Sequence, residues 1–395
     1  MKIAIIGAGF TGLSAGYFLA KKGIDVTIFE KESFPGGLAA SYSAKNWQWP
    51  LEQYYHHLFT SDYEIKKLAK ELGIKINYRR VKTSNLTDRG FFALDSPLGL
   101  LRYPKLNYLD KIRTGLTLLV LKLLPFQKSL EKISVQTFIL RYMGEKSWRF
   151  IWQPLFEGKF GPDANKIPAI WFWARIKKRS SRLGYPEGGF ANLTNKLIEA
   201  IKKQGGKIYF NQKVVSYEKM GKTFDKVIST LPTGQIKSLG VINLILRLKK
   251  SFLPDKIYWL NINLKNFSFL SVVEHTNMIS PQNYNGEHLI NVGKYLPANH
   301  PDFFLTKEDL LKKFNQDLIK ICPDYQRSII DFEVFKSYYA QPIIPLNYSS
   351  IIQPIKTKIP GFYQASMEQV YPWDRGTNYA VSLGKMVAKE IIKQK

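Results

Sequence analysis

Two adjacent histidines, His56 and His57, are prominent among the side chains that could do chemistry, because the chain of 395 residues has only five histidines. Paired imidazoles can ligate a metal, relay a proton or pack in a turn. A metal site is disfavoured, since no third ligand lies at ligand spacing and the single cysteine, Cys322, cannot form a Cys/His cluster. We expect no bound metal and treat the pair as candidate catalytic residues.

Three arginines, Arg175, Arg179 and Arg182, form a second candidate cluster in the stretch RIKKRSSR. Guanidinium groups bind phosphate oxygens through paired N–H donors, so the cluster could clamp a diphosphate. The alternative is a solvated helix end followed by a turn. Tyr185, three residues further on, completes the predicted substrate-binding set.

Three glycines, Gly7, Gly9 and Gly12, have the spacing G-x-G-x-x-G. In a strand–turn–helix unit the first permits a tight turn, the second lets the backbone approach a pyrophosphate, and the third lets helix and strand pack closely. The amino-terminal end of the helix then offers free N–H groups to the phosphates. The motif therefore predicts a dinucleotide site.

The elements that such a site needs surround the glycines. An apolar run at 3–6 is typical of a buried parallel strand, apolar residues at helical spacing cover 13–22, and a second strand covers 25–29. Glu30 ends that second strand, where a carboxylate can accept hydrogen bonds from a ribose 2′-hydroxyl. The unit therefore favours an unphosphorylated adenosine.

The segment FEKESFPGGLAASYS adds a glycine pair just after the second strand. It resembles the second glycine motif of the superfamily of FAD-dependent amine oxidases, protoporphyrinogen oxidases and phytoene desaturases, although Leu38 stands where many members have arginine. The resemblance implies FAD, held without a covalent bond. The residues expected to hold it in this part of the chain are Gly7, Gly9, Phe10, Thr11, Gly12, Glu30, Lys31, Gly36, Gly37 and Leu38.

Four later segments resemble the same superfamily, so the resemblance extends along nearly the whole chain. They are residues 180–196, 205–219, 224–232 and 359–391. In the second of these, the resemblance implies that Val214 or Val215 touches the adenine. In the last, it implies a loop that closes over the flavin, formed by Trp373, Asp374, Arg375, Gly376, Thr377 and Asn378.

The stretch around the histidine pair is similar to one that lies against the isoalloxazine ring in UDP-galactopyranose mutases. Adjacent residues of an extended chain point to opposite sides, so we expect one of His56 and His57 to face the flavin, with structural packing as the alternative. Beyond the pair, Ser61 and Glu64 have the S-x-x-E spacing of a capping box, which predicts a helix from there to Leu72.

The resemblance implies an α/β fold with a Rossmann-like FAD-binding domain of the glutathione-reductase type and an interlocked α+β substrate domain. The flavin-binding motifs are scattered, so the long segments between them must form the substrate domain, the first mainly helical and the second mainly strands. The predicted FAD-binding parts are residues 1–79, 185–236 and 353–395, and the predicted substrate-domain parts are residues 80–184 and 237–352.

The formal net charge of +27 would attract an anionic or lipid-like small molecule or an anionic membrane surface, the alternative being a merely solvated surface. The basic, leucine-rich stretch 101–126 could rest on a membrane or form a core helix. Nucleic acid is not expected, because no recognised binding pattern appears. The most apolar stretch, 114–124, is too short to cross a bilayer, and no signal-peptide pattern opens the chain, which predicts a cytoplasmic protein.

These features predict a FAD-dependent oxidoreductase that takes a hydride from an apolar or amphipathic small molecule. Aromatic residues make up 14% of the chain, which fits an apolar pocket. The alternative is a non-redox flavoenzyme like UDP-galactopyranose mutase, acting on a nucleotide-sugar or another phosphorylated glycan precursor. The arginine cluster favours that alternative.

Overall fold

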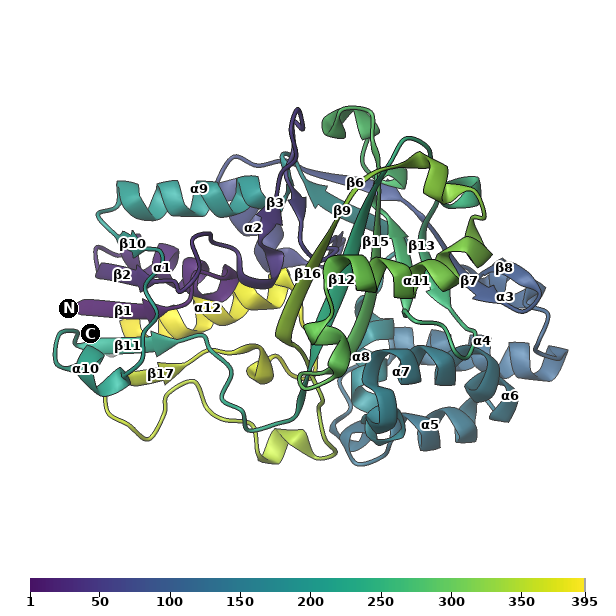
Figure 1. Ribbon diagram of the computed structural model, residues 1–395. Helices are drawn as coiled ribbons and strands as arrows, with labels where there is room; N and C mark the ends of the chain where they lie inside the picture. Colours follow the sequence, from purple (N-terminus) through teal and green to yellow (C-terminus); the bar gives the residue numbers. More distant parts are fainter. Residues whose placement is uncertain (394–395) are drawn as a thin grey trace.

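The structure, a computed structural model, describes residues 1–393. A five-stranded parallel sheet forms the left part of Figure 1. Its strands, in spatial order, are β10 (Lys207–Tyr209), β2 (Asp25–Phe29), β1 (Lys2–Ile6), β11 (Lys226–Ser229) and β17 (Phe362–Gln364). One face packs against helices and the other against the segment 214–224. Because both faces are covered, the central strand β1 is apolar from Ile3 to Ile6.

Three helices cover the first face of this sheet: α1 (Phe10–Ala20), α9 (Gly189–Lys203) and α12 (Thr377–Ile392). Helix α1 lies between the other two and contacts both (Figure 1). Nine of its 11 residues are buried, which is why it is apolar on nearly all sides. It crosses α12 so closely that a Cβ on Gly384 would lie 2.4 Å from the carbonyl oxygen of Thr11.

The predicted strand–helix–strand unit at the start of the chain is confirmed by β1, α1 and β2. The helix begins at Phe10, three residues before the apolar spacing indicates. The reason is that Gly7 to Gly9 complete the turn, so the helix can start at once. The predicted helix at the other end of the chain is α12.

A second sheet has seven strands, and its neighbours are antiparallel except for one parallel pair, β13 and β7. In spatial order the strands are β16 (Ile329–Pro342), β12 (Ser238–Leu248), β15 (His288–Pro297), β14 (Ser271–Glu274), β13 (Ile257–Ile262), β7 (Lys82–Thr87) and β8 (Gly90–Ala93). Helix α11 (Lys307–Ile321) packs Phe314 and Leu318 against it. Since β7 and β8 come from a much earlier part of the chain, the two segments interlock within one sheet.

A lobe of six helices occupies the lower right of Figure 1. They are α3 (Pro97–Arg102), α4 (Tyr108–Leu123), α5 (Val135–Tyr142), α6 (Glu145–Ser147), α7 (Gln153–Phe160) and α8 (Ala169–Lys178). Helix α8 is the innermost, with its first six residues buried, and α4 and α5 pack against it. Among residues 1–393, a helix with both the length and the apolar character needed to cross a bilayer does not occur.

Smaller elements complete the fold. They are the antiparallel strands β5 (Leu58–Phe59), β9 (Arg182–Pro186) and β6 (Ile76–Arg80), the hairpin of β3 (Ser41–Tyr42) and β4 (Leu51–Glu52), and the helices α2 (Tyr63–Glu71) and α10 (Tyr217–Gly221).

The capping box predicted at the start of α2 is wrong. Asp62, rather than Ser61, occupies the N-cap position. The amides of Glu64 and Ile65 donate to the side-chain Oδ1 of Asn378, at 2.9 and 3.2 Å. A residue of α12 therefore supplies the cap of α2, from a position 314 residues away in the chain.

The crossing of α1 and α12 yields a test of the fold. In Gly384→Ala the new methyl group meets the α1 backbone, so we expect the free energy of unfolding to fall by about 1–3 kcal/mol. In the control Gly115→Ala, also inside a helix, the methyl group makes an ordinary contact at 3.5 Å, and stability should stay the same or rise. Thermal unfolding followed by circular dichroism compares the two, and equal midpoints would contradict the close crossing.

Candidate active site

A cavity of about 1040 Å³ lies between the parallel sheet on one side and the second sheet with the helical lobe on the other. Its wall comes from the loops after β1 and β2, the loop before β5, helices α7 and α8, and the start of α12. The carboxyl ends of parallel strands are the usual ligand edge of an α/β sheet. We therefore take this cavity as the candidate active site.

The loops after β1 and β2 touch through their main chains at the edge of the cavity. Gly9 forms a bridge with Gly36, and a Cβ on Gly37 would lie 3.3 Å from the Gly9 Cα. Gly36 has φ +110°, and a Cβ there would lie 2.9 Å from the backbone of the next turn. Because the N-cap of α1 is Gly9, which has no side chain, the amides of Phe10 and Thr11 are left for a ligand.

Gly12 lies in the first turn of α1 and is buried against the loop after β1. A Cβ on Gly12 would lie 1.9 Å from the carbonyl oxygen of Gly7, which itself has φ +101°. Gly12 thus permits the close packing of helix on loop, as its place in the motif predicts, while Gly7 and Gly9 line the cavity.

Glu30, at the end of β2, is 7% exposed and lines the cavity. Its Oε2 accepts the Ala8 amide at 2.7 Å, and its Oε1 accepts the Glu32 amide at 3.0 Å. These two bonds fix the carboxylate in place. Each oxygen still has a lone pair with which to accept a ligand hydroxyl.

Helix α12 brings a second amino-terminal end to the cavity, where Gly376, Thr377 and Asn378 line the wall. Gly376 is the N-cap, and the first amides of a helix have no acceptor within the helix. Two helix amino-terminal ends, those of α1 and α12, therefore meet at one cavity, and both favour negative charge there.

Residues 10–392 match the family described as flavin containing amine oxidoreductase. The chain belongs to this family. The structure supports the same fold, since a solved structure titled putative protoporphyrinogen oxidase, from Exiguobacterium sp. 255-15, superposes with a TM-score of 0.77 at 16% identity, over 100% of this chain and 99% of that one. A reduced UDP-galactopyranose mutase superposes with a TM-score of 0.74 at 16% identity, over 100% and 96% of the two chains.

Curated relatives are similar over shorter stretches. Coproporphyrinogen III oxidase of Staphylococcus aureus is 28% identical over 217 residues, which is 50% of this chain and 44% of that protein. L-amino-acid oxidase of Crotalus adamanteus is 25% identical over 239 residues, 55% of this chain and 45% of that protein. The matched stretches thus span about half the length of these relatives.

FAD is the cofactor of the family, and the residues present fit it. The main-chain contact of Gly9 with the second glycine loop leaves room for a diphosphate beside the α1 amides, and Glu30 offers acceptors for a ribose. When bound, FAD supplies the capacity to accept a hydride. Lys31, Leu38 and Val214 also line the cavity. Val214 packs on the face of the parallel sheet that the three helices do not cover.

Two residues expected to hold the cofactor lie outside the cavity wall. Val215 is 82% exposed, because it follows Val214 in an extended segment and so points the opposite way. Trp373 stands behind the wall, with its ring stacked 6.0 Å from that of Tyr379, which does line the cavity. Of the two valines offered for the adenine contact, Val214 is therefore the one that faces the cavity, and Asp374 faces it in place of the neighbouring Trp373.

The predicted substrate set divides in two. Arg175 and Arg179, at the carboxyl end of α8, line the cavity. Arg182 is exposed on β9, and Tyr185 is buried on the same strand, where its hydroxyl donates to Glu52 at 2.7 Å. Arg182 and Tyr185 are therefore removed from the substrate set, because β9 is held between β5 and β6 and directs both side chains elsewhere.

Both histidines of the pair line the cavity, and the expectation that one of them faces the flavin stays a prediction. Their rings nevertheless have different neighbours. The His56 ring packs 5.5 Å from buried Phe190, and its Nδ1 lies 2.6 Å from the Tyr54 carbonyl oxygen. The His57 ring lies 5.8 Å from that of Trp259, which lines the cavity.

Burial determines the charge of both histidines. It lowers the pKa of His56 to about 4, and burial together with the neighbouring His56 and arginines lowers the pKa of His57 to about 3. Both imidazoles are therefore neutral at pH 7. Each can donate one hydrogen bond and accept another in the cavity, but neither carries the second proton that would make it a cation.

A cluster of cations surrounds one carboxylate on the lobe side of the cavity. Asp374 forms ion pairs with Arg175 and with Lys159, the latter at 3.5 Å. Burial would raise the pKa of Asp374, but Lys159, Arg175 and Arg375 outweigh that effect and hold it well below its usual range. The carboxylate is thus ionised at every pH of interest, and the cluster retains a net positive charge.

Lys159, on α7, was not among the sequence candidates, because it belongs to no motif and its partner lies 215 residues away. Burial lowers its pKa to about 7, although Asp374 opposes the shift. Burial and Arg175 likewise lower the pKa of Arg179, to about 10. Arg179 is therefore charged at pH 7, whereas Lys159 titrates near neutral pH.

The remaining wall on this side is aromatic. Trp152 packs 4.7 Å from Phe172, and Trp171 packs 5.7 Å from Phe156, measured between ring centroids. All four rings line the cavity. Apolar walls with a few charged groups are typical of small-molecule sites.

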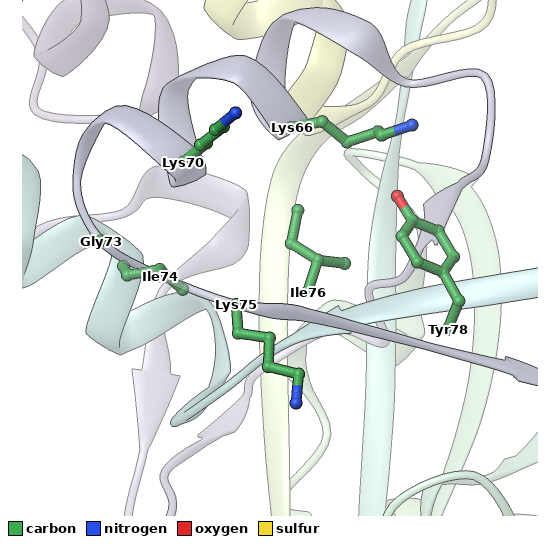
Figure 2. A pocket seen from close by; sticks show the side chains of 7 residues that line it. All are labelled: Lys66, Lys70, Gly73, Ile74, Lys75, Ile76 and Tyr78. Carbon is green, nitrogen blue, oxygen red and sulfur yellow. The ribbon is translucent and has the colours of Figure 1, made fainter.

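A second hollow, of about 420 Å³, lies between α2 and β6. Figure 2 shows Lys66, Lys70 and Lys75 around it, with Tyr78 at one side. Within residues 1–393 its lining shares no residue with the cavity. In that same part of the chain, no three His, Cys, Asp or Glu side chains are grouped as metal ligands.

The position of Glu30 predicts how the cofactor is retained. Glu30→Ala removes the acceptors for the ribose, so we expect the FAD dissociation constant to rise about 10- to 100-fold. The control is Glu199→Ala, which removes an exposed carboxylate on α9. Fluorescence titration of each apoprotein with FAD measures the difference, and equal dissociation constants would show that Glu30 does not contact the cofactor.

Proposed function

We propose that this chain is a FAD-dependent oxidoreductase whose substrate has an apolar body and at least one anionic group. The observation that carries the proposal is a cation cluster set in an aromatic wall: Lys159, Arg175 and Arg375 surround the single carboxylate of Asp374, and Arg179 lines the same side of the cavity. Aromatic rings bury the body of such a molecule, and the uncompensated cations bind its carboxylate or phosphate.

The residues of this chain would orient the substrate rather than react with it. The aromatic wall excludes water and holds the carbon that loses a hydride to FAD, while the companion proton leaves to solvent or to a group in the cavity. His56 and His57, being neutral, would act as hydrogen-bonding groups beside the flavin. The helical lobe would thus bind the anionic group of the substrate, and the loops of the parallel sheet would bind the cofactor.

The names of the relatives include two kinds of substrate that differ in charge. Porphyrinogens are large apolar rings with carboxylate side chains, whereas putrescine is a dication. A cavity with net positive charge favours the first kind and repels the second. Among the chemistries associated with the family, the cluster therefore supports an anionic substrate.

Anaerobic mixing tests the proposal. We expect coproporphyrinogen III to bleach the yellow flavin absorbance of the purified protein, and putrescine to do so at least about 100-fold more slowly, because like charges oppose its binding. Faster bleaching by putrescine would contradict an anionic substrate class. Loss of bleaching in Arg175→Gln, with FAD content unchanged, would support the role of the cluster.

A second candidate function is isomerisation of a nucleotide-sugar by reduced flavin without net electron transfer. It is supported by Arg175 and Arg179, since paired guanidinium groups also suit a diphosphate. The same experiment separates the two candidates. Turnover of UDP-galactopyranose only after dithionite reduction, with no bleaching by any substrate, would favour this second function.

The pKa of Lys159 predicts a pH dependence. Below about pH 7 its ammonium group adds a positive charge to the cluster, and above about pH 7 that charge is lost. The KM for an anionic substrate should therefore rise about tenfold as the pH increases from 6 to 8.5. Lys159→Met removes the titrating group, so its KM should be high and flat across this range. A wild-type KM that falls with pH would contradict the assignment.

A further inference from the structure

The carboxyl-terminal end of α8 carries two of the cavity cations, Arg175 and Arg179, and no glycine closes it. Arg179, the residue after the last helical position, is extended, with φ −61° and ψ 134°. The left-handed turn that often satisfies the last carbonyl oxygens of a helix is therefore not formed here. These oxygens need hydrogen-bond donors from elsewhere in the fold.

Remote side chains supply these donors. The Ser61 hydroxyl donates to the carbonyl oxygen of Lys178 at 2.9 Å. The Lys122 ammonium group, on α4, donates at 3.3, 3.1 and 2.5 Å to the carbonyl oxygens of three further residues, Ile176, Lys177 and Arg179. The carbonyl oxygens of residues 176–179 are thus all capped from outside the helix, and one lysine provides most of the cap.

Lys122 is held in this position by the same pair of helices. The Lys177 ammonium group donates in return to the carbonyl oxygens of Lys122 and Leu123, at 2.9 and 3.2 Å. The carboxyl-terminal ends of α4 and α8 therefore cap each other, and each lysine offsets the partial negative charge of the helix end that it meets. Lys122 itself lies outside the cavity wall, so any effect that it has on a bound molecule must pass through α8.

The two arginines of α8 depend on this cap to different extents. Arg175 is fixed a second time, by its ion pair with Asp374. Within residues 1–393 the Arg179 guanidinium group forms no ion pair of this kind, although it lines the cavity. The direction of the Arg179 side chain therefore depends on its backbone, whose carbonyl oxygen Lys122 holds.

We propose that Lys122 is a positioning residue for substrate binding: it fixes the end of α8 so that the Arg179 guanidinium group faces the anionic group of the substrate. The inference rests on the proposed function, in which the cations of the cavity bind that anion. It adds a residue that does not touch the cavity to those that determine the affinity for substrate.

Binding of coproporphyrin III, an aromatic tetracarboxylate, to the FAD-loaded protein tests the proposal without requiring turnover. Lys122→Met removes the ammonium donor, so we expect the dissociation constant, measured from the porphyrin absorbance, to rise about tenfold, as for the loss of one charged hydrogen bond. Lys122→Arg keeps the charge and the donors and should bind within about twofold of the wild type. Failure of Lys122→Arg to restore binding would contradict the role of the cap.

The matched control is Lys111→Met, on the same helix. Lys111 caps α3 in a similar manner, with its ammonium group 2.6 Å from the Leu101 carbonyl oxygen, but none of the six residues of α3 lines the cavity. Lys111→Met should therefore bind coproporphyrin III like the wild type, and an equal loss in both variants would overturn the proposal. FAD content and the thermal midpoint show that each variant is folded. Lys122→Gln, which keeps a shorter donor, replaces Lys122→Met if the latter does not fold.

A double-mutant cycle distinguishes positioning from a general loss of stability. In an Arg179→Gln background the group that Lys122 positions is gone, so adding Lys122→Met should weaken binding by less than about twofold further. If Lys122→Met causes its full loss in both backgrounds, Lys122 acts independently of Arg179 and the proposal is wrong.

Flavin reduction separates this inference from the proposed function. With coproporphyrinogen III as the reductant, Lys122→Met should raise KM and leave kcat unchanged, because only binding is affected. A wild-type flavin that coproporphyrinogen III does not bleach, together with weaker porphyrin binding by Lys122→Met, would overturn the proposed function and support the positioning role. Equal porphyrin binding by wild type and Lys122→Met, with wild-type bleaching intact, would overturn the positioning role alone. If the wild type binds neither coproporphyrin III nor inorganic pyrophosphate, both are overturned.

Discussion

The contact of main chain with main chain at the amino-terminal end of α1 is the constraint on which the rest of the structure depends. Gly9 meets Gly37 there, and Gly384 of α12 lies against the backbone of Thr11 and Ala15 at the start of α1. A Cβ at Gly37 would lie 3.3 Å from the Gly9 Cα, and one at Gly384 would lie 2.4 Å from the Thr11 carbonyl oxygen, so side chains there would push the segments apart. The absence of Cβ atoms therefore sets the distance between three remote parts of the chain, and with it the shape of the cofactor side of the cavity.

Local patterns predicted the parts of the site that are made by local contacts. The glycine spacing and Glu30 lie within one strand–helix–strand unit, and that unit is confirmed. The capping box at Ser61 failed because a distant side chain, that of Asn378, binds the same amides. Lys159 gave no signal, since its pairing with Asp374 exists only after α7 and the start of α12 come together. The sequence also did not predict which side chains face the cavity, as Val215 and Arg182 show. Alternation along an extended segment implies that neighbouring side chains point to opposite sides, but not which of them points inward.

The two sides of the cavity favour negative charge through different groups. On the parallel sheet, negative charge meets helix amino-terminal ends and main-chain amides, which are neutral overall and cannot be titrated. On the lobe it meets side-chain cations, of which Lys159 titrates near pH 7. Helix α4 packs directly on α8, and the Lys122 ammonium group donates to the carbonyl oxygens of Ile176 and Lys177. One layer of helix thus separates the basic outer surface from the arginines of the cavity.

The position of α12 on the cavity has a consequence for biosynthesis. Helix α1 starts at Phe10 and α12 starts at Thr377, so 367 residues must be added between the two helix starts that complete one binding surface. At translation rates of about 5–20 residues per second, this interval lasts roughly 20–70 s. During that time the face of α1 that α12 will cover is exposed, and the nucleotide loop lacks one of its walls. The complete cofactor site therefore forms only after α12 has been synthesised, and until then part of the apolar surface of α1 has no partner.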